Sequence, residues 1–513
     1  MISSERMAAV DANAAALGVP SKQLMESSGN AVARAVRSAS DPGDAVALVC
    51  GRGNNGGDAF VAARFLADRD VTVHLLGRPE SIGTAIAREN WEALHAAEIP
   101  SETVADSADF DLGSPAVVVD AVLGTGVSGT LREPARTAVE EINASGGRGG
   151  ESGGDGAIVI AVDVPSGVDA DTGEPTGGDG AVAVDADRVV TFHDAKPGLE
   201  RLEADVTVAD IGIPAAAERY TGPGDLLGLG RSPDSHKGEN GEVLVVGGGP
   251  YTGAPSLSAR AALRAGADLA RVACPASVAD EIQGYSADLI VRPLPGESLG
   301  PDHFDRVAEL AADQDVVVIG PGMGNAEASL EFVRRFLADF SGRAVVDADA
   351  LRVVPEVETD AELICTPHQG ELRGMGGETA ADPNERAELV RAFAAEVGHT
   401  LLVKGRYDVI ASDDGETVRQ NRTGNPGMTV GGTGDVLAGT VGALAAQTDP
   451  RTAQTDPRTT QTDRNAARTD PFQAAAAGAY VNGLAGDAAA EANGHGLVAT
   501  DLIDRLPDAL YDE

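Results

Sequence analysis

Short apolar segments followed by a glycine-rich loop or an acidic residue recur throughout this chain of 513 residues. They lie at residues 45–50, 117–119, 158–162, 189–192, 242–246, 316–319, 344–346, 363–365 and 401–403. Apolar strands that alternate with helical patterns predict parallel sheets covered by helices. Because all strands of such a sheet end at one edge, the loops are expected to gather there and form ligand sites. The length exceeds that of one typical core, so we predict two α/β domains.

The acidic composition narrows the classes of partner. The chain has 80 acidic and 39 basic residues, which gives a net charge of −41. The acids are spread along the chain, as in solvated acidic surfaces adapted to a salt-rich, halophilic cytoplasm. A cation-binding acidic surface is the less favoured alternative, since no acid cluster has ligand spacing. This charge argues against nucleic acid and anionic membranes as partners.

Lysine and cysteine usage adds two expectations. Only four lysines occur against 35 arginines, and Lys196, Lys237 and Lys404 lie inside Gly/Asp-rich motifs. This placement indicates chemistry or phosphate contacts, with chance as the alternative. The three cysteines show no metal or disulfide spacing. With no signal-peptide pattern or apolar membrane span, we expect a soluble cytoplasmic protein and leave open whether it is a homo-oligomer.

The glycine-rich string at residues 424–439, GNPGMTVGGTGDVLAG, predicts a loop that feeds a helix. Its first turn would be residues 432–435, whose free backbone N–H groups form an anion hole. The Asp435 carboxylate beside that hole could take a proton from a hydroxyl. The simpler alternative is a glycine-rich turn in which Asp435 only caps the helix.

This string resembles the catalytic signature of the ADP/ATP-dependent NAD(P)H-hydrate dehydratases, a branch of the ribokinase-like fold. Motifs in the same order run through residues 235–439, with departures at Gln369 and at residues 429–430. The resemblance implies that the hydrated dinucleotide contacts Ala254, Gly322, His368 and the catalytic Asp435. It implies nucleotide binding by Lys404, Gly405, Arg406, Tyr407, Asp408 and Gly434, with a magnesium ion. His368 by itself would more often be structural.

Three strands of the first half end in loops rich in glycine and oxygen ligands. Residues 51–58, GRGNNGGD, match G-x-G-x-x-G only weakly, but two amides and a carboxylate could serve a monovalent cation and a phosphate. An Asn/Gly turn is the alternative. Arg78, after the second strand, could suit a 2′-phosphate, although a surface position is favoured. The loops at residues 120–131 and 163–173 follow the next two strands. Asp163, at a strand end, is a candidate general acid or base, or else a cap.

These loops resemble the NAD(P)H-hydrate epimerase domain. The resemblance implies Asp163 as the general acid/base, with Lys196 near it, and a potassium ion held by Asn55, Asp120 and Ser166. Substrate contacts would come from Asn54, Asn55, Gly56, Gly57, Asp58, Gly124, Thr125, Gly126, Val127, Ser128, Gly129, Thr130 and Asp163. Ala59 departs from the family's usual glycine.

The domain boundary is predicted near residue 221, in a stretch rich in Gly and Pro. Residues 1–220 would be a Rossmann-like, doubly wound epimerase domain and 221–513 a ribokinase-like dehydratase domain. A Gly/Ser-rich insert at 144–156 and a low-complexity insert at 447–471 are expected to be flexible.

The combined resemblance implies a bifunctional enzyme of metabolite repair, an isomerase joined to a lyase. The first domain would interconvert the epimers of hydrated NADH or NADPH. The second would dehydrate the S epimer at the expense of ADP or ATP, giving AMP or ADP and phosphate. The rivals are a vitamin or sugar kinase, which would release a phosphorylated product, and a non-enzymatic protein-binding module. The sequence does not fix the choice between ADP and ATP or between the two dinucleotides.

Overall fold

The computed structural model describes residues 1–126, 129–146, 156–178, 180–231, 234–447 and 468–511. Two compact units divide the chain, Met1–Ala217 and Glu218–Glu513. Most of both predicted inserts, at 147–155 and 448–467, lies outside the described residues. No helix in the described residues has the length and apolarity that a bilayer crossing requires.

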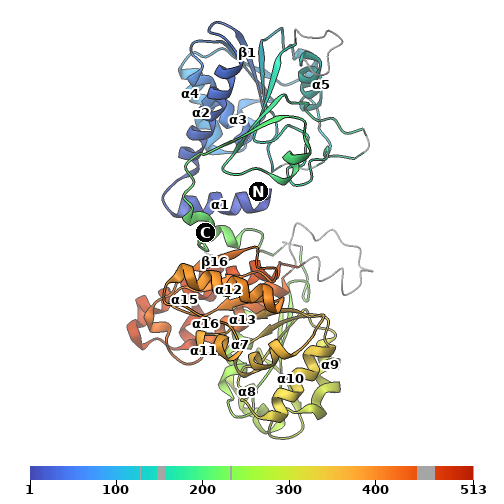
Figure 1. Cartoon of the computed structure of the whole chain (residues 1–513), viewed down its shortest axis with the longest axis vertical. Coiled ribbons are helices and arrows are strands. Elements are labelled where there is room, and N and C mark those ends of the chain that lie inside the picture. The colour runs from blue at the N-terminus through green and yellow to red at the C-terminus, as the bar shows by residue number, and fades with distance from the viewer. Residues whose placement is uncertain (127–128, 147–155, 179, 232–233, 448–467, 512–513) are drawn as a thin grey trace. The chain divides into compact units, whose positions relative to one another are not determined.

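The first unit contains a seven-stranded sheet with the order β3-β2-β1-β4-β5-β6-β7, in which every neighbouring pair is parallel (Figure 1). The strands are β1 (Ala45–Cys50), β2 (Asp70–Leu76), β3 (Ser101–Val104), β4 (Val117–Ala121), β5 (Ile158–Val162), β6 (Arg188–Phe192) and β7 (Asp205–Ala209). The order reverses direction between β1 and β4, the point at which doubly wound sheets open a ligand crevice. The predicted Rossmann-like fold is confirmed.

Helices cover both faces of this sheet because alternate strand residues point to opposite sides. Val46 and Leu48 of β1 pack on one side, whereas Ala47 and Val49 pack on the other. The helices are α1 (Ser4–Ala16), α2 (Ser21–Ala39), α3 (Asn54–Phe65), α4 (Ala85–Ala96), α5 (Ala135–Ser145) and the short α6 (Ala216–Arg219). The first four share a core with one face of the sheet, and α5 packs on the other.

A turn ends the sheet of the first unit. The last strand of the first unit, β7, ends at Ala209. Gly212 then adopts φ +88°, and its N–H donates to the Asp210 carboxylate at 2.8 Å. This turn, together with Pro214, prevents the chain from continuing as a strand.

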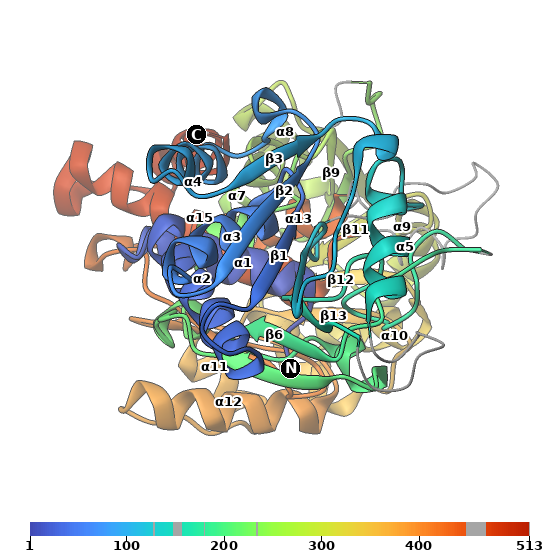
Figure 2. The same cartoon turned by 90° about the horizontal axis from the view of Figure 1, so that it is seen from above.

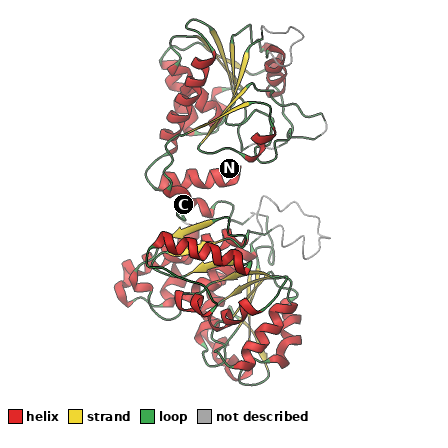
Figure 3. Ribbon diagram, in the orientation of Figure 1, coloured by secondary structure: helices red, strands yellow, loops and turns green. Residues whose placement is uncertain are grey.

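The second unit is built on a nine-stranded sheet with the order β10-β9-β8-β11-β12-β13-β14-β15-β16 (Figure 3). The strands are β8 (Glu242–Val246), β9 (Leu269–Pro275), β10 (Ile290–Leu294), β11 (Val316–Ile319), β12 (Arg343–Val346), β13 (Glu362–Cys365), β14 (Thr400–Val403), β15 (Asp408–Ala411) and β16 (Val418–Asn421). All pairs are parallel as far as β14, and the β14–β15 and β15–β16 pairs are antiparallel. The predicted, largely parallel sheet is confirmed.

Helices also form a layer on each face of the second sheet (Figure 2). They are α7 (Gly253–Arg264), α8 (Ala279–Tyr285), α9 (Phe304–Ala311), α10 (Glu327–Asp339), α11 (Gln369–Gly374), α12 (Pro383–Val397), α13 (Thr433–Ala446), α15 (Pro471–Asn493) and α16 (Ala499–Tyr511). Gly439 lets α13 approach α7 closely, since a Cβ there would lie 2.0 Å from the Ser258 carbonyl oxygen. This contact fixes the start of α13 against the edge where the strands end.

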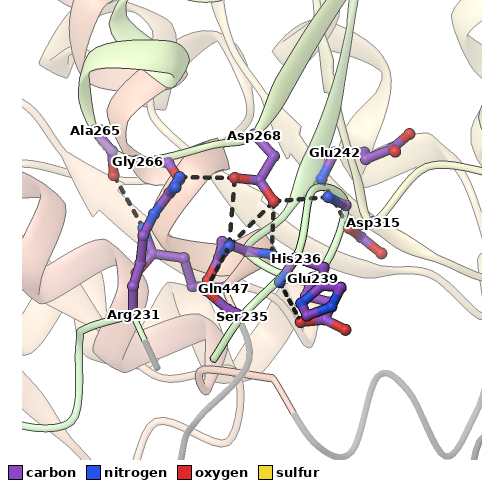
Figure 4. A network of polar contacts seen from close by, with 12 residues as sticks. Arg231, Ser235, His236, Glu239, Glu242, Ala265, Gly266, Asp268, Asp315 and Gln447 are labelled. Atoms are coloured by element: carbon purple, nitrogen blue, oxygen red, sulfur yellow. Dashed lines mark hydrogen bonds and ion pairs between the residues drawn. The ribbon is translucent and has the colours of Figure 1, made fainter. Parts of the chain in front are cut away.

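A polar network fastens the segment that leads into β8 (Figure 4). Asp268 accepts hydrogen bonds from the backbone N–H groups of Gly238 and Asn240 at 2.7 and 3.1 Å. It also forms an ion pair with Arg231 at 2.8 Å. These contacts hold the predicted motif around Lys237 to the start of β9, at the edge of the sheet opposite the strand ends.

Candidate active sites

A cavity of about 930 Å³ lies at the carboxyl edge of the first sheet. The loops that follow β1, β4, β5 and β6 line it, and α1 and α2 supply further lining residues. Among the predicted site residues, it is lined by Asn54, Asn55, Asp58, Gly124, Thr125, Gly126, Gly129, Thr130, Asp163 and Lys196. Val127 and Ser128 lie outside the described residues. The structure therefore brings the three predicted loops together at one site.

Asp163 and Lys196 form a buried ion pair in this cavity. The Asp163 Oδ1 lies 2.9 Å from the Lys196 Nζ, whose side chain is fully buried, and 3.0 Å from the Thr191 hydroxyl. The lysine also donates to the carbonyl oxygens of Phe192 and Asp194 at 2.9 and 3.3 Å. Asp163 has φ +64°, a left-handed conformation that costs a non-glycine residue about 1 kcal/mol or more. Such strain at a charged, anchored side chain is typical of functional sites.

Two further carboxyl groups face the same cavity. Burial raises the pKa of Asp58 well above its usual value, and the nearby charges of Asp163 and Asp11 raise it further. The pKa of Asp11, on α1, is raised to about 6, mainly by burial and then by Asp163, while Lys196 opposes the shift. The site therefore combines a carboxylate anchored by a lysine with two carboxyl groups whose protonated forms are favoured by burial. A lysine-paired carboxylate next to a carboxyl group that favours its protonated form is suited to paired acid and base chemistry.

Sequence reasoning missed Asp11. It follows Val10, a buried residue of α1. An acidic residue directly next to core-facing apolar residues is unusual, and this was the sequence feature that could have indicated Asp11.

The predicted loop at residues 54–58 is instead the first part of a helix. α3 begins at Asn54, inside the stretch predicted as a loop. The Asn54 side-chain oxygen accepts a hydrogen bond from the Thr84 hydroxyl at 2.7 Å, which holds the helix start near α4. A Cβ on Gly56 would lie 2.2 Å from the Gly51 carbonyl oxygen, so this helix can cross the end of β1 only with glycine. Gly57 is buried in the same turn, where a Cβ would lie 2.7 Å from the Met25 methyl carbon.

Two of the three predicted potassium ligands, Asn55 and Ser166, contact Leu123, and the third, Asp120, is hydrogen-bonded to Ser166. Ser166 donates its hydroxyl and its backbone N–H to the Asp120 carboxylate at 2.6 and 2.7 Å. The Leu123 N–H donates to the Ser166 hydroxyl at 2.8 Å, and the Asn55 amide donates to the Leu123 carbonyl at 2.9 Å. Asp120 is fully buried, and burial raises its pKa to about 6. No basic side chain pairs with it among the described residues, which leaves an uncompensated buried carboxylate.

In the second unit, Asp435 lies in the first turn of α13, as predicted from the glycine-rich string. Gly432 caps this helix with φ +95°, a conformation that favours glycine. Burial and the charge of Asp347 raise the pKa of Asp435 to about 7, while Lys404 opposes the shift. The Ser258 hydroxyl donates to the Asp435 carbonyl at 2.8 Å and ties this turn to α7.

Lys404 forms the second lysine–carboxylate pair of the chain's predicted sites. Its Nζ lies 2.8 Å from the Asp347 Oδ1, and the Thr366 hydroxyl donates to the same oxygen at 2.8 Å. A Cβ on Gly434 would lie 3.2 Å from the Lys404 Nζ, so the lysine reaches the first turn of α13. Glu371 lies 4.0 Å from the same nitrogen. Sequence reasoning gave no role to Asp347 or Glu371, although Asp347 directly follows a predicted strand.

The remaining predicted residues occupy three loops at the carboxyl edge. His368 caps α11, where its Nδ1 accepts the N–H groups of Gly370 and Glu371 at 2.9 and 3.0 Å. The histidine is thus structural in part, and its side chain is 59% exposed, with its Nε2 3.5 Å from the Glu371 Oε1.

The 404–408 loop is closed by Asp408, which accepts the Gly405 N–H at 3.0 Å. Burial raises the pKa of Asp408, and the Arg406 guanidinium lies over the Tyr407 ring at 5.6 Å. Gly322 has φ +71° and packs beside Ala254, since a Cβ on Gly322 would lie 3.3 Å from the Ala254 Cβ. Ala254 lies in the first turn of α7, and Gly322 lies in the loop after β11 that packs against this turn.

Comparison with known proteins gives matches in both units. The family model described as YjeF-related protein N-terminus matches residues 21–198, and that described as NAD(P)H-hydrate dehydratase matches residues 243–508. The chain is 42% identical to the bifunctional NAD(P)H-hydrate repair enzyme Nnr of Methanothermobacter thermautotrophicus, over 98% of this chain and 94% of the relative. It is 43% identical to the Nnr enzyme of Pyrobaculum aerophilum, over 99% of this chain and 97% of the relative.

Among solved structures, the chain is similar to the ADP/ATP-dependent NAD(P)H-hydrate dehydratase of Bacillus subtilis co-crystallised with ATP and Mg²⁺. The two are 24% identical with a TM-score of 0.44, over 55% of this chain and 92% of the other. The full-length relatives decide the assignment, since they match both units in one polypeptide. The chain therefore belongs to the family of bifunctional NAD(P)H-hydrate repair enzymes.

Proposed function

We propose that the chain repairs hydrated NADH and NADPH at two sites. The first unit interconverts the epimers at C6 of the hydrated nicotinamide ring. The second dehydrates the S epimer at the expense of ADP or ATP and releases AMP or ADP and phosphate. One observation carries this proposal: each unit places a buried lysine–carboxylate pair, Lys196 with Asp163 and Lys404 with Asp347, beside a carboxyl group of raised pKa.

Epimerisation at C6 needs a base and an acid. C6 carries a hydroxyl next to the ring nitrogen, so loss of the hydroxyl proton and protonation of the nitrogen open the ring to an aldehyde. Rotation about the neighbouring single bond and closure on the other face give the second epimer with no net change. Asp163, held by Lys196, takes the hydroxyl proton, and protonated Asp58 supplies the proton to nitrogen.

The Asn55, Asp120 and Ser166 cluster suits a potassium ion. Its candidate ligands are oxygen atoms with a single carboxylate, a set that fits a hard monovalent cation. A bound cation would supply the charge that the buried Asp120 carboxylate lacks. It would also hold the loop that begins at Leu123 against Ser166, and that loop leads into the cavity.

The second site supports transfer of a phosphoryl group to the C6 hydroxyl. Asp435 takes the hydroxyl proton, and the free N–H groups at the start of α13 hold the negative charge that develops. Lys404 supplies a positive charge to the phosphate at the same turn. The C6–O bond then breaks with its electron pair on the departing phosphate, while the lone pair of the neighbouring ring nitrogen forms a double bond to C6. Loss of a proton from C5 to water then gives the reduced nicotinamide ring. Magnesium would accompany the nucleotide phosphates, because no cluster of three metal-binding side chains gathers in the described residues.

The test starts from each pure epimer of hydrated NADH or NADPH and follows the absorbance of the reduced nicotinamide with ADP or ATP present. From the S epimer, Asp435→Asn should abolish recovery, whereas Asp163→Asn should leave it unchanged. From the R epimer, both substitutions should lower recovery to the uncatalysed rate. Recovery from the S epimer that survives Asp435→Asn would refute the second site. A phosphorylated product that accumulates in place of free phosphate would indicate a kinase.

A further inference from the structure

The cavity of the first unit extends beyond the reacting centre to the end of β2. Leu76, Ser81 and Gly83 line it there, three strands away from Asp163 at the end of β5. Because neighbouring strands lie about 4.8 Å apart, these two ends are separated by about 14 Å across the sheet. An extended dinucleotide bridges such a distance across the switch point of a doubly wound sheet. With the nicotinamide at Asp163, the adenosine end lies at β2.

The side chain of Arg52 reaches the end of β2, where such folds recognise the adenosine ribose. It follows the end of β1 and lines the cavity. Its stem crosses Gly77, the residue after β2, since a Cβ on Gly77 would lie 2.9 Å from the Arg52 Cδ. Sites that bind the ribose hydroxyl carry an acid near the end of this strand, whereas an arginine there accommodates a 2′-phosphate. In this chain β2 is followed by Gly77, and the side chain of Arg52 covers this glycine.

The guanidinium of Arg52 is available for a ligand. It forms no ion pair or side-chain hydrogen bond within the described residues, although the chain carries 80 acidic residues. Lys196 at the other end of the cavity is, in contrast, paired with Asp163. Arg78 follows Gly77 but does not line the cavity, so Arg52 is better placed than Arg78 to meet a 2′-phosphate.

We propose that Arg52 binds the 2′-phosphate of the dinucleotide, so that the first unit prefers hydrated NADPH to hydrated NADH. This inference rests on the proposed epimerase function. A guanidinium can donate two parallel hydrogen bonds to a phosphate and carries a permanent charge. Hydrated NADH has no 2′-phosphate, so the guanidinium stays exposed to water and adds nothing to the binding of this substrate.

The experiment uses the full chain with pure R epimers and no adenine nucleotide, so that only epimerisation proceeds. Chromatographic separation of R and S epimers over time gives kcat/KM for each dinucleotide after subtraction of the uncatalysed rate. The wild-type protein should favour hydrated NADPH, and Arg52→Gln should lower kcat/KM for it by about 10- to 100-fold, mostly through KM. The rate with hydrated NADH should change by less than about threefold, which also shows that the variant is folded. Arg78→Gln is the matched control and should change neither rate.

The outcomes separate this inference from the proposed function. If the wild-type protein epimerises neither dinucleotide, the proposed function of the first unit fails. If it epimerises both but Arg52→Gln leaves their ratio unchanged, or slows both equally, Arg52 does not recognise the 2′-phosphate. An equal change in ratio for Arg78→Gln would also overturn the assignment, because it would indicate a general charge effect.

Discussion

Replacing Lys196 with methionine should destabilise the first unit through Asp163. The ammonium group has three protons and three acceptors, the Asp163 carboxylate and the carbonyl oxygens of Phe192 and Asp194. Methionine fills a similar volume but leaves the carboxylate without its cation. Removal of one partner from a buried ion pair costs about 3–5 kcal/mol. Asp163 keeps 16% of its side chain exposed and retains the Thr191 hydrogen bond, so we expect about 3 kcal/mol.

The chain offers a probe that reports on the first unit alone. Trp91 is the single tryptophan of the sequence, lies on α4, and is 4% exposed with its ring 5.2 Å from that of Phe60. Its fluorescence during urea unfolding therefore measures the first unit, and the second unit does not contribute to the signal. The free energy of unfolding follows from the midpoint and slope of this transition.

Two further variants make the reasoning refutable. Lys22→Met breaks an ion pair with Glu89 whose side chains are 58% and 54% exposed, and it should cost less than about 0.5 kcal/mol. The double variant Asp163→Asn/Lys196→Met removes both charges and should recover at least about half of the loss. If Lys196→Met costs no more than Lys22→Met, or if the double variant recovers nothing, the buried pair is not what stabilises this site.

The raised pKa values of the site carboxyl groups lead to three other predictions. The pKa of Asp435 is about 7 and its ionised form is the base, so kcat/KM for dehydration of the S epimer should rise with pH and level off about one unit above that value. Asp11 has a folded-state pKa of about 6 against an ordinary 3.8, so the folded state holds the extra proton between these values and stability falls as pH rises through that window. Asp11→Asn should remove about 2–3 kcal/mol of this fall, measured by Trp91 unfolding at about pH 4 and pH 7. Potassium should raise the midpoint of Trp91-monitored unfolding more than choline does, and Asp120→Asn should abolish the difference, whereas an unchanged difference would exclude Asp120 as a ligand.

The sequence allowed most of the fold to be predicted because local patterns and global topology agree. Strands such as 158–162 and 242–246 consist mainly of buried apolar residues, and the structure places them at the same residues. The errors fall where glycine and asparagine have two possible conformations. Residues 54–58 resemble a turn, but packing of Gly56 over Gly51 makes them a helix start.

The sites could be predicted only in part, for a related reason. Asp163 and Asp435 stand at strand and helix ends, where position alone indicates a ligand site. Asp11 lies in the interior of a helix, and its approach to Asp163 depends on how α1 packs over the sheet. No local pattern carries that information. The same holds for Arg52, whose path across Gly77 depends on the pairing of β1 with β2.

The presence of lysine rather than arginine at positions 196 and 404 has a physical explanation. Lys196 is fully buried and meets one carboxylate oxygen and two carbonyl oxygens, an arrangement that matches the three directions of an ammonium group. A planar guanidinium has five donors, so arginine in this position would leave buried N–H groups without acceptors. Lys404 likewise reaches one Asp347 oxygen while it lies under the first turn of α13, where a larger head group would meet Gly434. Two of the four lysines of this arginine-rich, acidic chain therefore lie where a compact charge must contact a carboxylate inside a site.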